Sequence, residues 1–185
     1  MVFKSDKNHS PLSSEIKIKK GHTNNVYELQ KLAATTFQES HGHSALPVDI
    51  QTYIESRFTS ENLIAELADS NNLFYLIYWD EELIGYSKII LNTDYEAQTP
   101  SNSSKLERLY VLQKFHGTEV GKLLMDFNIQ LAKENQQSGM WLYVWTENHR
   151  AIHFYEKYGF VQIAETVFQI SKNHGNPNFI LYLMF

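Results

Sequence analysis

The sequence contains no cysteine among its 185 residues. This absence excludes disulfide bonds, thiolate zinc sites, iron–sulfur clusters and a cysteine nucleophile. It also gives no indication of an oxidising compartment, in which disulfides persist. Any group transfer by this chain therefore proceeds without a covalent cysteinyl intermediate.

Long apolar runs are missing as well. The longest runs, such as residues 180–185, fall far short of the ~20 apolar residues that span a bilayer. Residues 1–14 (MVFKSDKNHSPLSS) lack the apolar core of a secretory signal. We therefore predict a cytoplasmic protein without membrane association, in which residues 1–14 form a flexible tail and residues 15–185 form a single domain.

Positive charge is also scarce. The formal net charge is -5, from 16 basic and 21 acidic residues, so nucleic acid is not an expected partner. The acidic residues concentrate in residues 41–100, which hold ten of them against only Arg57 and Lys88. This segment is either a solvated acidic surface or a surface that attracts a cationic ligand.

What the chain does contain is a clear succession of helical and strand patterns. Helical spacing of apolar residues predicts helices over residues 24–39, 47–58, 60–67, 120–135 and 149–158. Gly42 ends the first helix and leaves residues 41–43 in a polar loop. Strands are predicted at residues 15–19, 73–79, 83–91, 106–112, 141–145, 160–168 and 179–185. The order β-α-α-α-β-β-β-α-β-α-β-β includes hairpins and two crossover helices, which predicts an α/β fold with a mixed sheet and helices on its faces.

A glycine-bearing loop separates one predicted strand from the helix that follows it. The segment reads RLYVLQKFHGTEVGKLL, and the helix begins between Gly117 and Gly121. Such a junction directs free backbone N–H groups and the positive end of the helix dipole at one point, which suits a phosphate. Lys114, His116 and Lys122 add positive potential there. On spacing alone, the segment is either a phosphate site or a plain turn.

A second segment, NHRAIHFYEKYGF, predicts a helix with one functional face. Asn148, Ala151 and Tyr155 lie at positions i, i+3 and i+7 and therefore share a face. Gly159 ends this helix before the next strand. On spacing alone, Tyr155 is either a packed aromatic residue or a functional phenol.

No metal site is predicted. His149 and His153 stand four residues apart on a helix, a spacing that can bind zinc. The residues between them are Arg-Ala-Ile, without the glutamate of a zinc-protease motif. Solvated histidines are therefore favoured over metal ligands.

Together, the two segments resemble the GNAT superfamily of acetyl-CoA-dependent N-acetyltransferases. The strand, glycine loop and helix are followed by N-x-x-A-x-x-F-Y-x-x-x-G-F. Within the superfamily, ERLYV before the loop and WLYVWTEN-x-x-A-x-x-FY after it are similar to PaiA-type spermidine/spermine acetyltransferases. The resemblance covers residues 15–185 and implies a GNAT-like α/β (α+β) fold, with a mixed, partly splayed β-sheet and helices on both faces.

The resemblance implies that acetyl-CoA is the co-substrate and assigns residues to it. Backbone groups of residues 109–111 would hold the pantetheine arm and the thioester carbonyl, and residues 116–121 would hold the pyrophosphate. Tyr155 would be the general acid that protonates the departing CoA thiolate. The residues expected to bind the co-substrate are Leu109, Tyr110, Val111, His116, Gly117, Thr118, Glu119, Val120, Gly121, Lys122, Asn148, Ala151 and Phe154.

Glu107 is the candidate general base. At pH 7, removing a proton from a primary ammonium costs about 4–5 kcal/mol, so a base should assist. Strand alternation predicts that the side chain of Glu107 lies on the same side as Leu109 and opposite to Arg108. An ion pair between Glu107 and a neighbouring cation is the equal alternative. In the implied reaction, the amine attacks the thioester directly.

The resemblance also places the first helices beside a small-molecule amine acceptor. The side chains predicted to contact the acceptor are Phe37, His41, Tyr53 and Trp145, and the acidic residues predicted to surround it are Glu39, Asp49, Glu55 and Glu66. Because aromatic rings and carboxylates attract ammonium groups, a polyamine or another small cationic amine is the expected acceptor. Two alternatives stay open: a degenerate GNAT-like sensor or scaffold that binds CoA thioesters without turnover, and a peptide or protein N-acetyltransferase. The chain is compatible with a monomer or a homodimer.

The glycine loop departs from the family pattern. Where Arg/Gln-x-x-Gly-x-Gly/Ala is usual, the chain reads HGTEVG at residues 116–121. The carboxylate of Glu119 would compete with a bound pyrophosphate or repel it. We therefore predict weaker co-substrate binding than in relatives with glycine, unless Glu119 points outward.

Overall fold

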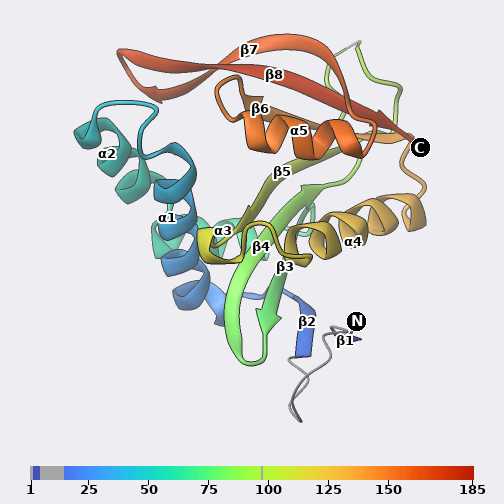
Figure 1. Cartoon of the computed structure of the whole chain (residues 1–185), viewed down its shortest axis with the longest axis horizontal. Coiled ribbons are helices and arrows are strands. Elements are labelled where there is room, and N and C mark those ends of the chain that lie inside the picture. Colours follow the sequence, from blue (N-terminus) through green and yellow to red (C-terminus); the bar gives the residue numbers. More distant parts are fainter. Residues whose placement is uncertain (1, 5–14, 97) are drawn as a thin grey trace.

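The computed structural model describes residues 2–4, 15–96 and 98–185 of the chain (Figure 1). Its helical elements are η1 (Thr23–Asn25), α1 (Val26–His41), α2 (Pro47–Arg57), α3 (Ser60–Ala68), η2 (Gln113–Phe115), α4 (Val120–Glu134) and α5 (His149–Lys157). Its strands are β1 (Val2–Lys4), β2 (Glu15–Lys20), β3 (Asn72–Trp79), β4 (Glu82–Ile90), β5 (Ser104–Val111), β6 (Gly139–Trp145), β7 (Val161–Ser171) and β8 (His174–Met184). From β2 onward, this order confirms the order predicted from the sequence.

The described strands form one eight-stranded sheet in the order β1-β2-β3-β4-β5-β6-β8-β7. β5 and β6 are parallel, since α4 crosses from the end of one to the start of the other, and the other neighbouring pairs are antiparallel. The predicted mixed sheet is therefore confirmed. Among the residues described, no helix is long and apolar enough to cross a bilayer.

Of the predicted N-terminal tail, the structure describes only residues 2–4. Val2–Lys4 forms β1 and pairs antiparallel with β2, with Phe3 opposite Ile16. The outer edge of β2 would otherwise leave a row of backbone N–H and C=O groups unpaired, and β1 covers part of that edge. Residues 1 and 5–14 of the predicted tail lie outside the described residues.

The last hairpin is longer than the apolar pattern predicts. β7 and β8 stay paired as far as Ser171 and His174, across a segment that the sequence predicts to be a turn. Polar residues can be strand residues here because they find partners: the Asn176 amide donates to Ser44 Oγ at 2.8 Å, in the loop between α1 and α2. The hairpin is therefore fastened to the first helices.

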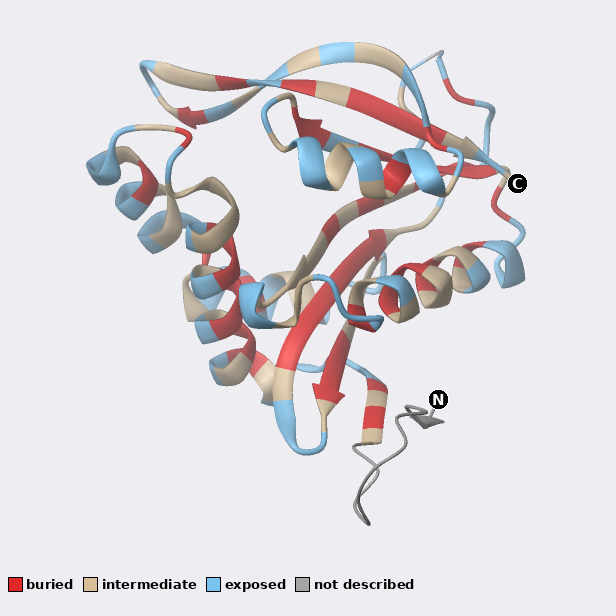
Figure 2. Cartoon of the chain, in the orientation of Figure 1, coloured by how far each residue is buried: buried red, intermediate tan, exposed pale blue. Residues whose placement is uncertain are grey.

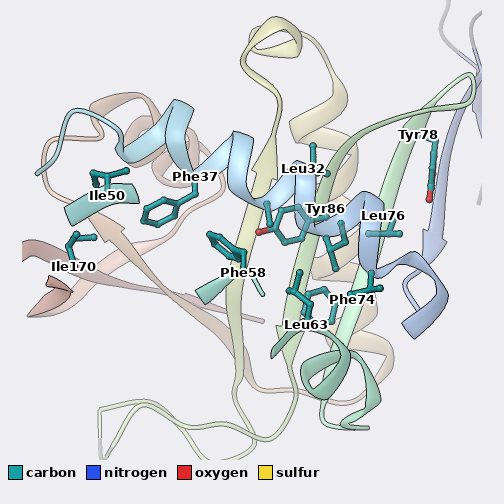
Figure 3. Packing of buried hydrophobic residues seen from close by; sticks show 13 residues of the cluster. Leu32, Phe37, Ile50, Phe58, Leu63, Phe74, Leu76, Tyr78, Tyr86 and Ile170 are labelled. Atoms are coloured by element: carbon teal, nitrogen blue, oxygen red, sulfur yellow. The ribbon is translucent and has the colours of Figure 1, made fainter. Parts of the chain in front are cut away.

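The helices cover the two faces of the sheet unequally. α1, α2 and α3 pack on one face around a cluster that includes Phe37, Phe58, Phe74 and Tyr86 (Figure 3). α4 and α5 pack on the other face against β5, β6 and β8. In Figure 2, buried residues follow the central strands and the inward sides of α1 and α4. Since each fully buried large apolar side chain contributes about 1.5–3 kcal/mol, these clusters fix the helices relative to the sheet.

β5 and β6 separate soon after they meet. They share the register pairs Ser104↔Met140 and Lys105↔Trp141, and beyond these each strand continues paired only on its outer side. The partly splayed sheet predicted from the sequence is thereby confirmed. The separation leaves an opening in the middle of the sheet, between the start of α4 and the start of α5.

Candidate active site

A cavity of about 790 Å³ occupies the opening between β5 and β6. Its lining comes from both faces of the sheet, with Phe37 and Tyr53 of α1 and α2 on one face and Gly121 and Tyr155 of α4 and α5 on the other. This size lies within the usual range of small-molecule sites. A cavity that reaches both faces can hold two ligands that meet near the plane of the sheet.

The loop before α4 presents unpaired backbone donors to the cavity. Within the described residues, the N–H groups of Gly117, Glu119, Gly121 and Lys122 have no hydrogen-bond acceptor. Gly117 has a φ of 80°, and a Cβ at Gly117 or Gly121 would meet nothing within 4 Å. The open space allows a ligand to approach the backbone, and the helix dipole favours an anion there. This end of the cavity therefore fits the pyrophosphate of a CoA thioester.

Charged side chains around this loop are paired or face away from the cavity. Lys114 Nζ lies 2.6 Å from Glu82 Oε1, and Lys122 Nζ lies 2.8 Å from Asp126 Oδ2. Glu119 is exposed and does not line the cavity, although residues on both sides of it do. Because the residue is solvent-exposed and outside the lining, water screens its carboxylate from the cavity, and the weaker co-substrate binding expected from Glu119 stays a prediction.

His116 is held by a hydrogen bond beside the same loop. Its Nε2 lies 2.9 Å from the carbonyl oxygen of Val111, and since a carbonyl only accepts, Nε2 carries the hydrogen. Burial lowers the pKa of His116, which disfavours its charged form. Arg150, in the first turn of α5, lines the cavity instead and has no ion-pair partner among the described residues.

α5 presents the predicted Asn148–Ala151–Tyr155 face to the cavity, and all three residues line it. Asn148 Oδ1 accepts a hydrogen bond from the Ala151 N–H at 3.2 Å, and Gly159, with a φ of 88°, follows the end of the helix as predicted. Burial raises the pKa of Tyr155 to about 12. The phenol therefore stays protonated throughout the neutral range and can donate its hydrogen into the cavity.

A β-bulge places Glu107 on the face opposite to the predicted one. Lys88 and Ile89 are adjacent on β4, but their partners on β5 are Arg108 and Leu106, so Glu107 is an extra residue between them. An extra residue breaks the alternation of side chains along a strand. Glu107 therefore shares a face with Arg108, whereas alternation predicts opposite faces.

The carboxylate of Glu107 is held by two ammonium groups. Its oxygens lie 2.5 Å from Lys88 Nζ and 3.6 Å from Lys105 Nζ, and Lys88 also pairs with Glu66 of α3 at 3.2 Å. Leu109, by contrast, packs against α4 on the other face. Burial alone would raise the pKa of Glu107, but Lys88 and Lys105 outweigh it and leave the pKa below its usual value. The structure thus contains the ion pair between Glu107 and neighbouring cations that was the alternative to a general base. The lowered pKa makes the Glu107 carboxylate a weak proton acceptor.

The four predicted acceptor-contacting residues meet on the side of the cavity that α1 and α2 cover. The ring of Phe37 stacks between His41 and Tyr53, with centroids 4.7 and 4.6 Å away, and Trp145 lies 6.1 Å from His41. All four line the cavity. His41 is the last residue of α1 and not part of a loop, because Gly42 caps the helix through its N–H to Gln38.

The predicted acidic wall does not form around the cavity. Glu39 lines it, but Asp49 and Glu55 do not, and Glu66 is bound in the ion pairs behind Glu107. Arg57, which also lines the cavity, has no ion-pair partner among the described residues. The acidic segment therefore belongs mostly to the solvated surface, in line with the plainer of the two interpretations of its charge.

The cavity thus gathers the side chains or backbone of every predicted site residue except Glu119 and Val120. Val120 is fully buried in the core beneath α4. The lining residues that sequence reasoning missed include Arg57, Phe58, Lys105, Tyr143, Arg150 and Phe168. Tyr143 could have been found, since it shares a strand face with Trp145 by the period of two. No group of three or more potential metal ligands occurs in the part of the chain that the structure describes.

Comparison with known proteins agrees with this site. The family model "Acetyltransferase (GNAT) family" matches residues 26–160. An uncharacterized N-acetyltransferase of Lactobacillus delbrueckii subsp. lactis is 28% identical over 153 residues, which cover 83% of this chain and 88% of that protein. One from Mycobacterium bovis is 27% identical over 149 residues, covering 80% and 91%.

Among solved structures, a PaiA N-acetyltransferase from Thermoplasma acidophilum in complex with coenzyme A superimposes with a TM-score of 0.74. The two sequences are 21% identical, and the match covers 92% of this chain and 99% of that one, so this likeness shows the fold. The family match spans most of the chain and includes the glycine loop and the Asn148–Tyr155 helix. The chain therefore belongs to the acetyltransferase (GNAT) family and is an N-acetyltransferase that uses acetyl-CoA as its co-substrate.

Proposed function

We propose that the protein acetylates a small primary amine by direct attack on the thioester within the β5–β6 opening. The single observation that carries this proposal is the cavity that reaches both faces of the sheet. The unpaired N–H groups before α4 lie on one side, and the aromatic side chains of Phe37 (α1) and Tyr53 (α2) lie on the other. Such a site accommodates an acyl donor and an amine together, which a mere CoA-binding sensor would not need.

Residues of the opening divide the proposed work between them. The N–H groups of Gly117, Gly121 and their neighbours bind the pyrophosphate, and Asn148 and the backbone of β5 orient the pantetheine arm. The amine nitrogen forms a bond to the acetyl carbon while the carbon–sulfur bond breaks and its electron pair goes to sulfur. Tyr155 donates its phenolic proton to that sulfur. A tyrosine whose pKa is about 12 is fully protonated when the thiolate departs.

In this proposal the acceptor is an amine with an apolar body, because the side of the cavity that α1 and α2 cover is lined mostly by aromatic rings. A polyamine is the acceptor that the resemblance to PaiA-type enzymes predicts, and its aliphatic chain suits Phe37 and Tyr53. Of the lining carboxylates, Glu107 is ion-paired, so Glu39 is the one available to a second ammonium group, while the Arg57 guanidinium, which also lines the cavity, opposes one. Diamines and monoamines are therefore proposed to be better acceptors than spermine.

A panel of amines tests this function. Purified protein with acetyl-CoA would be offered spermine, spermidine, a diamine, an aromatic monoamine, amino acids and a peptide, and free thiol would be measured over time. Mass spectrometry would confirm N-acetylation of the amine. Binding of acetyl-CoA without transfer to any amine would reject catalysis in favour of a sensor, and a strict preference for spermine would reject the proposed limit on acceptor charge.

A further inference from the structure

The ion-pair cluster beside the cavity holds more positive than negative charge. It is a group of five side chains in which three cations face two carboxylates: Lys88, Lys105 and Arg108 against Glu66 and Glu107. Each carboxylate is already shared between two of the cations. Within the cluster, one positive charge therefore has no carboxylate of its own.

Arg108 keeps part of its hydrogen-bonding capacity unused. Its side chain lines the cavity although the residue is only 8% exposed. Nη2 donates to Glu66 Oε1 at 2.9 Å, whereas Nη1 and Nε have no hydrogen-bond acceptor among the described residues. Because a buried N–H group without an acceptor costs free energy, a ligand that brings an acceptor atom to this guanidinium is stabilised there.

Arg57 supplies a second guanidinium from α2. Arg57 and Tyr53 lie at positions i and i+4, so they share one face of the helix, and both line the cavity. In the part of the chain that the structure describes, neither the Arg57 guanidinium nor the Tyr53 hydroxyl has a hydrogen-bond or ion-pair partner. Burial raises the pKa of Tyr53, and Arg57 and Arg108 oppose that rise more strongly than the carboxylates of the cluster reinforce it. Both guanidinium groups therefore lie near the phenol.

Two guanidinium groups beside a phenol suit a carboxylate. The planar fork of an arginine binds a carboxylate through two parallel hydrogen bonds, and a phenol can donate another. A second ammonium group on the acceptor would instead meet like charge at Arg57 and Arg108. Glu39, which also lines the cavity, accepts from the Gln113 N–H at 2.8 Å, beyond the end of β5, and so lies away from the middle of the strand that carries Arg108.

We propose that the acceptor is an aminocarboxylate, a primary amine whose apolar body ends in a carboxylate bound by Arg57 and Arg108. This inference rests on the transfer reaction proposed above and names the acceptor class for it. The carboxylate takes no part in the bond changes and directs the amine end toward the opening between β5 and β6. Since the carboxylate is remote from the reacting carbon, its binding stabilises the substrate and the transition state equally and lowers KM without raising kcat.

The first experiment changes only the far end of the acceptor. 6-Aminohexanoate, 6-aminohexanamide and 1,6-diaminohexane present the same amine on a similar chain that ends in an anionic, a neutral or a cationic group. For the parent protein we expect kcat/KM to be about tenfold higher or more for the carboxylate than for the amide, and lowest for the diamine. The difference should lie in KM, with kcat values within about threefold of each other. 4-(Aminomethyl)benzoate and its amide repeat the comparison with an aromatic body.

Variants of Arg57 test whether this residue carries the preference. Arg57→Gln should lower the ratio of kcat/KM for carboxylate over amide at least about fivefold. Arg57→Lys keeps the charge without the planar fork and should retain an intermediate ratio. Lys31→Gln, at an exposed cation of α1 outside the lining, is the matched control and should leave the ratio within about twofold of the parent. Equal kcat/KM for carboxylate and amide in both pairs, or a ratio that Arg57→Gln leaves unchanged, would overturn the inference.

A second experiment does not depend on turnover. Hexanoate and hexanamide carry no amine, so titrating each into the protein and following the NMR spectrum of the protein measures the carboxylate site alone. The parent should bind hexanoate about tenfold more tightly than hexanamide, and Arg57→Gln should lose most of this difference. Equal affinities of the parent for the two compounds would overturn the inference. If the parent transferred acetyl to no amine while hexanoate kept its advantage, the proposed function would fail, and with it the acceptor, whereas the carboxylate site would stand.

Discussion

Glu107 Oε2 lies 2.5 Å from the ammonium nitrogen of Lys88, inside the sheet and beside the acceptor side of the cavity. The β-bulge that brings them together also brings in Lys105, so the carboxylate faces two cations. A carboxylate in that position holds the bent strand in place and makes a poor base. Three members of this ion-pair cluster, Lys105, Glu107 and Arg108, line the cavity.

Replacing Glu107 by Gln should affect stability more than catalysis. Lys88 would keep Glu66, but Lys105 would lose its carboxylate and keep only the rings of Trp141 and Tyr143. We expect the free energy of unfolding to fall by about 1–3 kcal/mol, measured by urea denaturation, and kcat to fall less than about tenfold. Glu55→Gln, at an exposed carboxylate outside the cavity, is the control and should change neither. A 100-fold loss of kcat at unchanged stability would make Glu107 the base after all.

Tyr155→Phe should separate catalysis from binding. The phenyl ring fills the same space against Phe160, so the fold and the acetyl-CoA affinity should be retained. Without the phenolic hydrogen the thiolate departs unprotonated, and turnover should drop about 10²- to 10⁴-fold. Thiol release would give kcat, and calorimetry would give the dissociation constant. Turnover equal to that of the parent protein would remove Tyr155 from the mechanism.

Gly121→Leu should block the acyl donor without harming the fold. A Cβ at this position meets no atom within 4 Å, so the melting temperature should stay within about 2 °C. The added side chain would project into the space beside the free N–H groups and should weaken acetyl-CoA binding about tenfold or more. Glu119→Gln, two residues away and outside the lining, should leave the affinity within about twofold. The proposed phosphate site is wrong if both variants bind acetyl-CoA as the parent does.

His41 should make the protein less stable in mild acid. Its pKa is about 4 when folded and about 6.5 when unfolded, so between these values the unfolded chain binds a proton that the folded chain does not. Stability therefore falls as the pH drops below about 6.5, and the loss is complete only below about pH 4. Between pH 7.5 and pH 5 the parent should lose about 2 kcal/mol more than His41→Phe. Urea denaturation of both proteins at the two pH values measures this difference, because contributions from shared carboxylates cancel. Equal losses would show that His41 titrates normally.

Much of the fold was accessible from the sequence because its elements are strongly patterned. The continuous apolar runs of β3 and β4 and the helical spacing in α1, α4 and α5 each predict the element that forms. The motif pairs around Gly117 and Asn148 likewise predict which residues gather at the opening. At these places the local sequence pattern and the global fold favour the same secondary structure, so the element can be predicted from the local pattern alone.

The failures occur where the outcome depends on a partner that is distant in sequence. The face of Glu107 depends on how Lys88 and Ile89 pair with β5, and no local feature of β5 marks the bulge. The lowered pKa of His41 depends on its burial, to which rings of two distant strands, Tyr110 and Trp145, contribute. The acidic composition of residues 41–100 predicts an acidic wall, but Glu66 is paired with Lys88 and Arg108, and Asp49 and Glu55 do not line the cavity. Composition gives the number of charged residues, whereas the electrostatic character of a site depends on which of those residues line it without an ion-pair partner.

The two register pairs that join β5 to β6 have a kinetic consequence. Since the strands part immediately beyond them, the proposed reaction allows each substrate to reach the opening from its own side of the sheet. An amine that enters from the α1 and α2 side would not have to pass the CoA thioester. Direct attack requires both substrates at once, so we expect steady-state kinetics of a ternary complex and not of an exchange of one substrate for the other.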